Sequence, residues 1–219
     1  MDNVSELPNA DKFEAVLAAY KTYRDAVNND EISQAEASAR LPDAQVFCHP
    51  DTLAVIVILA ERHDSADADV QAGAAAVAKQ VMALPKVKIA VEEPITYNGT
   101  LLSNVGWAGD VSRKPQSQSL FEFEATAQGS ISHQIYARQV GGMIVATTRY
   151  AAERMPRDPQ RYNNPEINRT MVANLIANTS RAGDISVFPV GPDHLSRTYD
   201  RATLTDQLMA AGWDLLTND

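Results

Sequence analysis

The side chains best suited to metal or acid–base chemistry are scattered along the chain. Its four histidines are separated by spacings that no metal-binding motif uses: His49, His63, His133 and His194. Cys48 directly precedes His49, but adjacent residues project in divergent directions and make a poor chelate. The sequence therefore predicts no metal site, and it contains no motif that calls for a cofactor.

Cys48 is the only cysteine. As a nucleophile it would need a helix N-terminus or a cationic neighbour to lower its pKa. It stands instead just before Pro50 near the start of an apolar stretch, so we expect a small buried hydrophobic residue. A single cysteine excludes an internal disulfide and fits a reducing compartment.

Glu122 and Glu124 are the carboxylates whose spacing most resembles a catalytic pair. Two residues apart on a strand, they would lie about 7 Å from each other, which suits general acid–base work. They alternate with Phe121 and Phe123, however, as the solvated face of a half-buried strand does. The pair Gly141-Gly142 is followed by neither the helix nor the lysine of a phosphate-binding loop. We therefore expect a protein that is not an enzyme.

An arginine-rich stretch is the most distinctive charged feature of the sequence. Basic residues outnumber the acids Glu153, Asp158 and Glu166 here, although the whole chain carries a net charge of −9. The stretch also holds several prolines, and long irregular connections are common recognition sites. Two hypotheses follow: the arginines bind an acidic partner, or they bind the acidic N-terminal part of the same chain. The basic residues are Arg138, Arg149, Arg154, Arg157, Arg161 and Arg169.

Charge and hydropathy narrow the class of partner. The acidic excess lies in residues 1–70, and a chain of this charge is a poor match for nucleic acid or for anionic membrane surfaces. The longest apolar run, Leu53 to Ala60, is too short to span a bilayer. The first residues lack the pattern of a signal peptide, so we expect a cytoplasmic protein. A secreted lipoprotein-type member whose signal has been removed is the alternative.

The periodicity divides the chain into three parts. Residues 1–43 are predicted to be an acidic helical hairpin extension, with helical spacing from Phe13 to Val27 and a capping box from Ser33 to Glu36. Residues 44–183 are predicted to form the α+β core domain. Residues 184–219 are predicted to be a tail that packs on the core, with a strand at 185–190 and a helix at 203–211.

Within the core, Leu53 to Ala60 is a continuous β-branched run typical of a central strand covered on both faces. A long helix at 67–84, a strand at 87–91, an Asn98-Gly99 turn and a strand at 101–111 should follow. Residues 120–151 alternate in polarity around Gly129 and Gly141-Gly142, which predicts three antiparallel strands, the second at 131–140. A final helix is predicted at 167–181. We expect an antiparallel sheet packed on one face by the helices 67–84 and 167–181.

This order of elements has a counterpart among known proteins. Residues 53–181 resemble the Mog1/PsbP-like fold and, within it, the DcrB-like group. The group's acidic-Pro-x-Thr-x-x-Gly passage is matched by residues 93–99, and its late strand after a glycine turn by residues 142–148. Its opening Leu-Pro-x-x-Trp hairpin is not matched, because no tryptophan follows Leu41-Pro42. That departure bears on the subfamily more than on the fold.

The resemblance implies a binding function, because most members of the group are not enzymes. One branch binds a small GTPase, another binds photosystem subunits, and the Eag chaperones of type VI secretion hold apolar helices of an effector on a sheet. We therefore expect a chaperone- or adaptor-like module that recognises a protein partner, an apolar helix or an acidic segment. A structural component of a larger complex and an uncharacterised enzyme are the alternatives. The predicted partner-binding residues lie on the open sheet face and in the arginine-rich stretch: Tyr136, Arg138, Ile144, Thr148, Tyr150, Arg154, Arg157 and Arg161.

Overall fold

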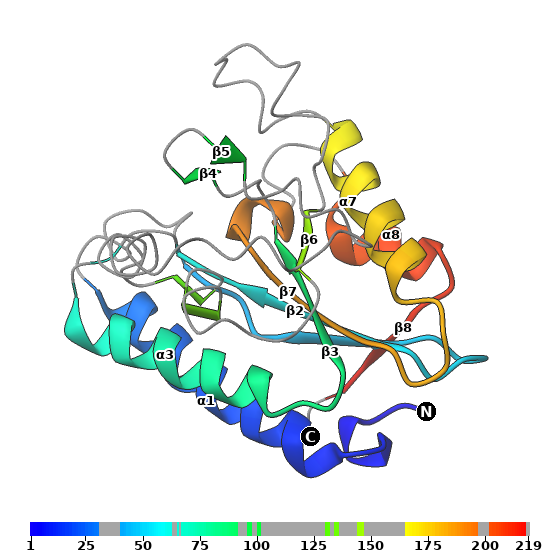
Figure 1. Cartoon of the computed structure of the whole chain (residues 1–219), viewed down its shortest axis with the longest axis horizontal. Coiled ribbons are helices and arrows are strands. Elements are labelled where there is room, and N and C mark those ends of the chain that lie inside the picture. Colours follow the sequence, from blue (N-terminus) through cyan, green and yellow to red (C-terminus); the bar gives the residue numbers. More distant parts are fainter. Residues whose placement is uncertain are drawn as a thin grey trace.

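The computed structural model has three layers, with a sheet between two layers of helices (Figure 1). Helices α1 (Ala10–Asn29) and α3 (Ala68–Met82) lie on one side of the sheet, and α7 (Pro165–Asn178) and α8 (Leu204–Ala210) lie on the other. The structure describes residues 1–30, 40–62, 65, 67–91, 96–97, 100–101, 130–131, 134–135, 144–146, 165–196 and 202–217.

The main sheet is mixed. Its strand order is β6-β3-β7-β2-β1-β8, and the pairings β6–β3, β3–β7 and β7–β2 are parallel, whereas β2–β1 and β1–β8 are antiparallel. The predicted α+β class is confirmed, but the purely antiparallel sheet is wrong. A long helix between two strands allows them to run parallel, and strand–helix–strand order alone does not reveal which strands pair. The strands are β1 (Gln45–Cys48), β2 (Val55–Ala60), β3 (Val87–Val91), β6 (Ile144–Ala146), β7 (Ile185–Val190) and β8 (Asp214–Leu216).

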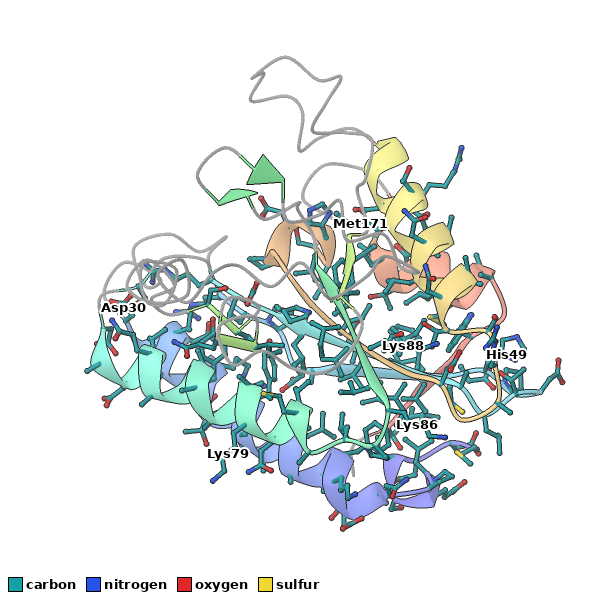
Figure 2. All side chains as sticks on the ribbon, viewed as in Figure 1. Asp30, His49, Lys79, Lys86, Lys88 and Met171 are labelled. Atoms are coloured by element: carbon teal, nitrogen blue, oxygen red, sulfur yellow. The ribbon has the colours of Figure 1, made fainter. Side chains whose placement is uncertain are left out.

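The two central strands are buried along their whole length. Every residue of β2 and β7 is buried, so the prediction of a central strand at 53–60 is confirmed. One apolar cluster joins the sheet to α1 and α3, and a second joins its other face to α7 and α8. Figure 2 shows Lys79 of α3 and Met171 of α7 on opposite sides of the sheet. At these strands the predicted open sheet face is therefore wrong.

The topology explains why helices cover both faces. The connection β2–α3–β3 crosses the sheet in one direction, past β7, and β6–α7–β7 crosses it in the other, past β3. Crossovers between parallel strands are right-handed, so connections that run in opposite directions place their helices on opposite faces. The expectation that helices 67–84 and 167–181 share one face is wrong for this reason, although both helices are present.

Helix α1 packs against α3 and contributes to the core. One face of α1 is buried, through Phe13, Val16, Tyr20, Tyr23 and Val27. The first helix of the predicted acidic hairpin is therefore confirmed, and it forms part of a layer. The predicted second helix falls mostly on residues 31–39, outside the described residues. The Asn28 side chain, before these residues, contacts Leu41, which follows them. Its Oδ1 accepts from the Leu41 backbone N–H at 2.7 Å, and its Nδ2 donates to the Leu41 carbonyl at 3.1 Å.

Helix α3 begins at a strong N-cap and approaches α1 very closely. The Asp67 carboxylate accepts from the backbone N–H groups of Asp69 and Val70 at 2.9 and 3.0 Å, satisfying two of the helix's free donors. One turn further, Gly73 faces α1 so closely that a Cβ there would lie 2.9 Å from the Tyr23 Cα. A hydrogen atom in place of a side chain allows this helix pair to form.

Short strands β4 (Thr96–Tyr97) and β5 (Thr100–Leu101) pair antiparallel, with Thr96 opposite Leu101 and Tyr97 opposite Thr100. Two residues separate them, as the predicted Asn98-Gly99 turn requires, although that pair itself lies outside the described residues. Of the predicted strand 101–111, only Leu101 is described, as the last residue of β5. Most of residues 120–151 also lie outside the described residues.

The described parts of 120–151 correct the predicted antiparallel strands. Ile131, Gln134 and Ile135 are helical, and the Gln134 N–H donates to the Ser130 carbonyl oxygen at 3.1 Å. Strand β6 pairs parallel with β3. Ile131 and Ile135 are four residues apart, a spacing that places both on one helical face as well as on one strand face. Their β-branched side chains favoured the strand interpretation, which was wrong.

Residues 184–219 contain the predicted strand and helix, but they are not a tail packed on the core: β7 lies in the middle of the sheet, between β3 and β2. The chain then passes through a 3-10 turn, η5 (Pro192–His194), to α8, whose N-terminus is a capping box between Thr203 and Asp206. At the other end of the chain, η1 (Val4–Glu6) lies beside β8: Val4 N–H donates to the Thr217 carbonyl at 3.1 Å. The two ends of the described chain are thus joined.

We predict that Gly73→Ala destabilises the protein. In a solvent-exposed helix this change would stabilise, since alanine is the better helix former by about 1 kcal/mol. Here the added methyl meets the backbone of α1, and overpacking of this kind costs about 1–3 kcal/mol. Urea unfolding should show the loss. The control is Ala76→Gly on the exposed side of α3, expected to cost about 1 kcal/mol. A more stable Gly73→Ala protein would disprove the close helix contact.

Candidate functional site

Most of the predicted partner-binding residues lie outside the described residues. These are Tyr136, Arg138, Thr148, Tyr150, Arg154, Arg157 and Arg161; Ile144 is the first residue of β6, where the backbone alone is described. The carboxylate pair Glu122 and Glu124 and the histidines His63 and His133 are also outside. The structure does describe the points at which the arginine-rich stretch joins the framework.

Both ends of residues 147–164 lie at the same edge of the sheet. The preceding residue, Ala146, ends β6, which runs parallel to β3 and β7. The following residue, Pro165, begins α7, and Asn168 in the first turn of α7 bonds His194, just beyond the carboxyl end of β7. The connection between β6 and α7 therefore starts and finishes at the carboxyl edge of the parallel strands. In open α/β sheets, ligands bind at this edge, where neighbouring connections leave to opposite faces.

His194 and Asn168 form a buried polar pair at this edge. Both side chains are almost fully buried, and His194 Nδ1 lies 2.6 Å from Asn168 Oδ1. The Asn168 Nδ2 donates to the Ala202 carbonyl at 3.0 Å, which fixes the orientation of the amide. Since Oδ1 can only accept, His194 Nδ1 must carry the proton and donate.

Glu61 and Ser130 form a second buried pair, next to the carboxyl end of β2. Glu61 is 1% exposed, and Ser130 Oγ donates to its Oε2 at 3.2 Å. The Glu61 backbone N–H donates to the Val190 carbonyl at 2.9 Å, so Glu61 directly extends the pairing of β2 with β7. The bond holds Ser130 against the core, next to the buried side chains of Ile131 and Ile135.

The buried tyrosines of α1 meet the same end of β2. The Tyr23 hydroxyl accepts from the Arg62 backbone N–H at 3.0 Å, and the Tyr20 hydroxyl donates to the Pro42 carbonyl at 2.9 Å. Burial raises the pKa of both tyrosines, and the charge of Glu61 adds to the rise. They are therefore neutral hydrogen-bonding groups that fix α1 to the sheet.

Acidic residues of the N-terminal part pair with arginines of the same part. Arg24 bonds Asp25 at 2.9 Å and also bonds Asp43. Arg62 bonds Asp30 at 2.5 Å, with both side chains 17% exposed. This bears on the two hypotheses for the arginine-rich stretch, because three acids of residues 1–43 already have basic partners from residues 1–62.

A separate polar group ties α7 to the amino edge of the sheet. Lys88 of β3 bonds Asp184 at 2.7 Å and donates to the Asn178 carbonyl at the end of α7, also at 2.7 Å. Nearby, the buried hydroxyls of Thr179 and Ser186 bond each other at 2.7 Å. Each end of α7 is thus attached to the sheet by a different set of side chains.

Cys48 is buried in β1, which confirms the prediction of a small buried hydrophobic residue. Burial raises the pKa of its thiol, and the charge of Asp214 adds to the rise. It is also far from His194. Cys48 lies opposite Val55 at the amino end of β2, whereas His194 follows the residue opposite Ala60 at its other end, about 16 Å away along the strand. The two cannot form a catalytic dyad.

His49 contacts an aromatic ring. The centroids of its ring and the Trp213 ring are 5.3 Å apart, in an edge-to-face arrangement. The Asp51 backbone N–H donates to His49 Nδ1 at 3.3 Å. In the part of the chain that the structure describes, no group of three His, Cys, Asp or Glu side chains is placed to hold a metal ion. Among the same residues, no helix has the length and hydrophobicity that crossing a bilayer requires.

Four buried polar side chains were not predicted from the sequence as structural partners: Glu61, Ser130, Asn168 and His194. A signal was present for two of them, since Glu61 directly follows an entirely apolar strand and His194 follows a strand that ends at Gly191-Pro192. Polar residues at the ends of buried strands mark the edge where loops are attached. Asn168 and Ser130 carry no comparable signal, because each meets its partner only through the tertiary fold.

Comparison of the chain with protein-family models, with curated proteins and with solved structures gave no match.

We predict that Ser130→Ala destabilises the protein by about 1–3 kcal/mol, because a buried carboxylate loses a hydrogen-bond donor. Denaturant unfolding measures the change. Ser180→Ala, at an exposed serine just after α7, is the control and should stay within about 0.5 kcal/mol. In a double-mutant cycle with Glu61→Gln, we expect a coupling of about 0.5–3 kcal/mol. Additive effects would show that the two side chains do not interact.

We also predict that the Cys48 thiol is protected in the folded protein. At pH 8, reaction with a disulfide reagent should be at least about 100-fold slower than in denaturant, because the thiolate is disfavoured and the side chain is buried. The raised pKa has a linked effect. Above the unfolded thiol's pKa the unfolded state loses its proton first, so this residue makes stability fall as pH rises. Rapid reaction under native conditions would contradict the burial.

Proposed function

We propose that the protein is a non-catalytic binding module, chaperone- or adaptor-like, that recognises an acidic segment of a protein partner. The arginine-rich connection between β6 and α7 is its recognition element, with Arg154, Arg157 and Arg161 as the central contacts. The observation that carries the proposal is that both ends of this connection lie at the carboxyl edge of the parallel strands. Recognition residues in α/β folds are concentrated in the connections at this edge.

The framework on either side of the connection supports this role. Strand β6 is paired with β3, and α7 is attached to the sheet through Asn168 near its start and through Asn178 and Thr179 at its end. A connection whose two ends are fixed in this way loses less conformational freedom on binding, and preorganisation of this kind raises affinity.

Charge favours a partner from outside the chain over the acidic N-terminal part. Asp25, Asp30 and Asp43 pair with Arg24 and Arg62, and α1 itself is packed on α3. Docking the same acids on the arginine-rich connection would compete with these pairs. Arginine forms strong, often bidentate hydrogen bonds with carboxylates, so an acidic peptide has the matching chemistry.

Two further parts of the proposal come from the sequence. The resemblance to the Mog1/PsbP-like fold supports a partner-binding role over catalysis. A cytoplasmic location is proposed with it, and the buried free thiol of Cys48 is compatible with a reducing compartment.

We predict that the double variant Arg154→Glu/Arg157→Glu loses affinity for acidic peptides. A fluorescein-labelled oligoglutamate peptide, titrated with protein at low ionic strength, reports binding by fluorescence anisotropy. The charge reversal should weaken binding by about tenfold or more, since it replaces two attractive contacts with repulsive ones. Raising the salt concentration should weaken the wild-type complex as well, because exposed charges are screened.

The control variant is Lys21→Glu/Lys79→Glu, on the exposed sides of α1 and α3. It changes the net charge by the same amount, but both residues belong to helices on the far side of the sheet from α7 (Figure 1). If this control weakens binding as much as the arginine variant, the effect is one of overall charge and the proposed site is wrong. The proposal also fails if the wild type does not bind the peptide.

A further inference from the structure

We propose that Asn168 is a positioning residue for the partner-binding connection between β6 and α7. This inference rests on the proposed function and names a residue outside the recognition element itself. Its basis is that the Asn168 side chain joins three parts of the chain at the carboxyl edge: the first turn of α7, the turn η5 after β7, and the residues before α8.

The contacts of Asn168 leave its side chain a single orientation. Nδ2 donates to the Ala202 carbonyl at 3.0 Å, and Oδ1 accepts from His194 Nδ1 at 2.6 Å. Asn168 and His194 are 0% and 2% exposed, beside the apolar cluster of α7, α8 and the sheet. A buried amide is costly to leave unpaired, so any shift at the start of α7 must break both bonds or carry both partners with it.

The Asn168–His194 bond matters for the connection because of where Asn168 lies in the chain. Asn168 lies three residues after Pro165, where α7 begins and the partner-binding connection ends. Fixing Asn168 to the turn after β7 therefore fixes where the connection returns to the framework. Thr179, just after the other end of α7, forms a comparable buried bond with Ser186 but lies at the amino edge of the sheet. It offers a control that disturbs the same helix away from the connection.

The experiment compares three variants in the oligoglutamate titration. Asn168→Leu removes both hydrogen bonds, Asn168→Asp keeps an oxygen for His194 Nδ1–H but loses the donor to the Ala202 carbonyl, and Thr179→Val removes the buried bond at the amino edge. Each is assayed well below its own unfolding temperature. We expect Asn168→Leu to weaken peptide binding about tenfold and Asn168→Asp to weaken it as well, while Thr179→Val stays within about threefold of wild type. Equal binding by Asn168→Leu and wild type overturns the proposal, as does an equal loss in Thr179→Val.

A second measurement does not depend on the peptide. Long-range ¹H–¹⁵N spectra of the histidine rings report which nitrogen carries the proton. We expect neutral His194 to be protonated on Nδ1 in the wild type and to lose this fixed tautomer in Asn168→Leu. If the peptide does not bind wild type, the proposed function fails, and the NMR result alone decides whether Asn168 orients His194. An unchanged His194 tautomer in Asn168→Leu overturns the positioning role in that case.

Discussion

The parallel pairing of β2 with β7 is the constraint on which the rest of the structure depends. Six residues of each strand pair in register, and all twelve are buried. Strands buried on both faces need a helical layer on each side. The right-handed connections supply these layers, α3 crossing on one face and α7 on the other. The sides on which α3 and α7 lie follow from these crossovers, and α1 and α8 complete the two layers, so neither face of β2 and β7 is open.

The same pairing determines where polar groups can be buried. Along β2 and β7, apolar side chains meet helices on both sides, so polar side chains are accommodated at the strand ends. Glu61 and His194 lie beyond the carboxyl ends, each bonded to a polar side chain from another part of the chain, Ser130 and Asn168. Burying such a pair costs little free energy when every polar group in it has a hydrogen-bond partner. The pair then favours one arrangement of the connections. At the carboxyl edge of the sheet, these buried polar pairs therefore hold other segments of the chain in fixed positions.

Local pattern predicted the elements well and their arrangement poorly. The continuous apolar run at 53–60, the alanine-rich helix after it and the capped helix near the end were all identified, because each depends on its own residues. Strand direction, the face that each helix covers and the helical turn at Ile131 and Ile135 depend on distant partners. The prediction of an open sheet face assumed helices on one side only, and the helices cover both faces of β2 and β7. The predicted partner-binding residues themselves stay a prediction, because nearly all of them lie outside the described residues.

A binding site on the arginine-rich connection would differ from one on a sheet face in what positions its side chains. A sheet face presents side chains at spacings set by the strands, whereas the described attachments of this connection are at its two ends, β6 and the first turn of α7. If the connection binds an acidic partner as proposed, its affinity depends on how firmly those ends are fixed as well as on the arginines themselves. Asn168 holds the framework at one end, and the pairing of β6 with β3 holds it at the other. Under that proposal, residues that never touch the partner contribute to its recognition by fixing these two ends.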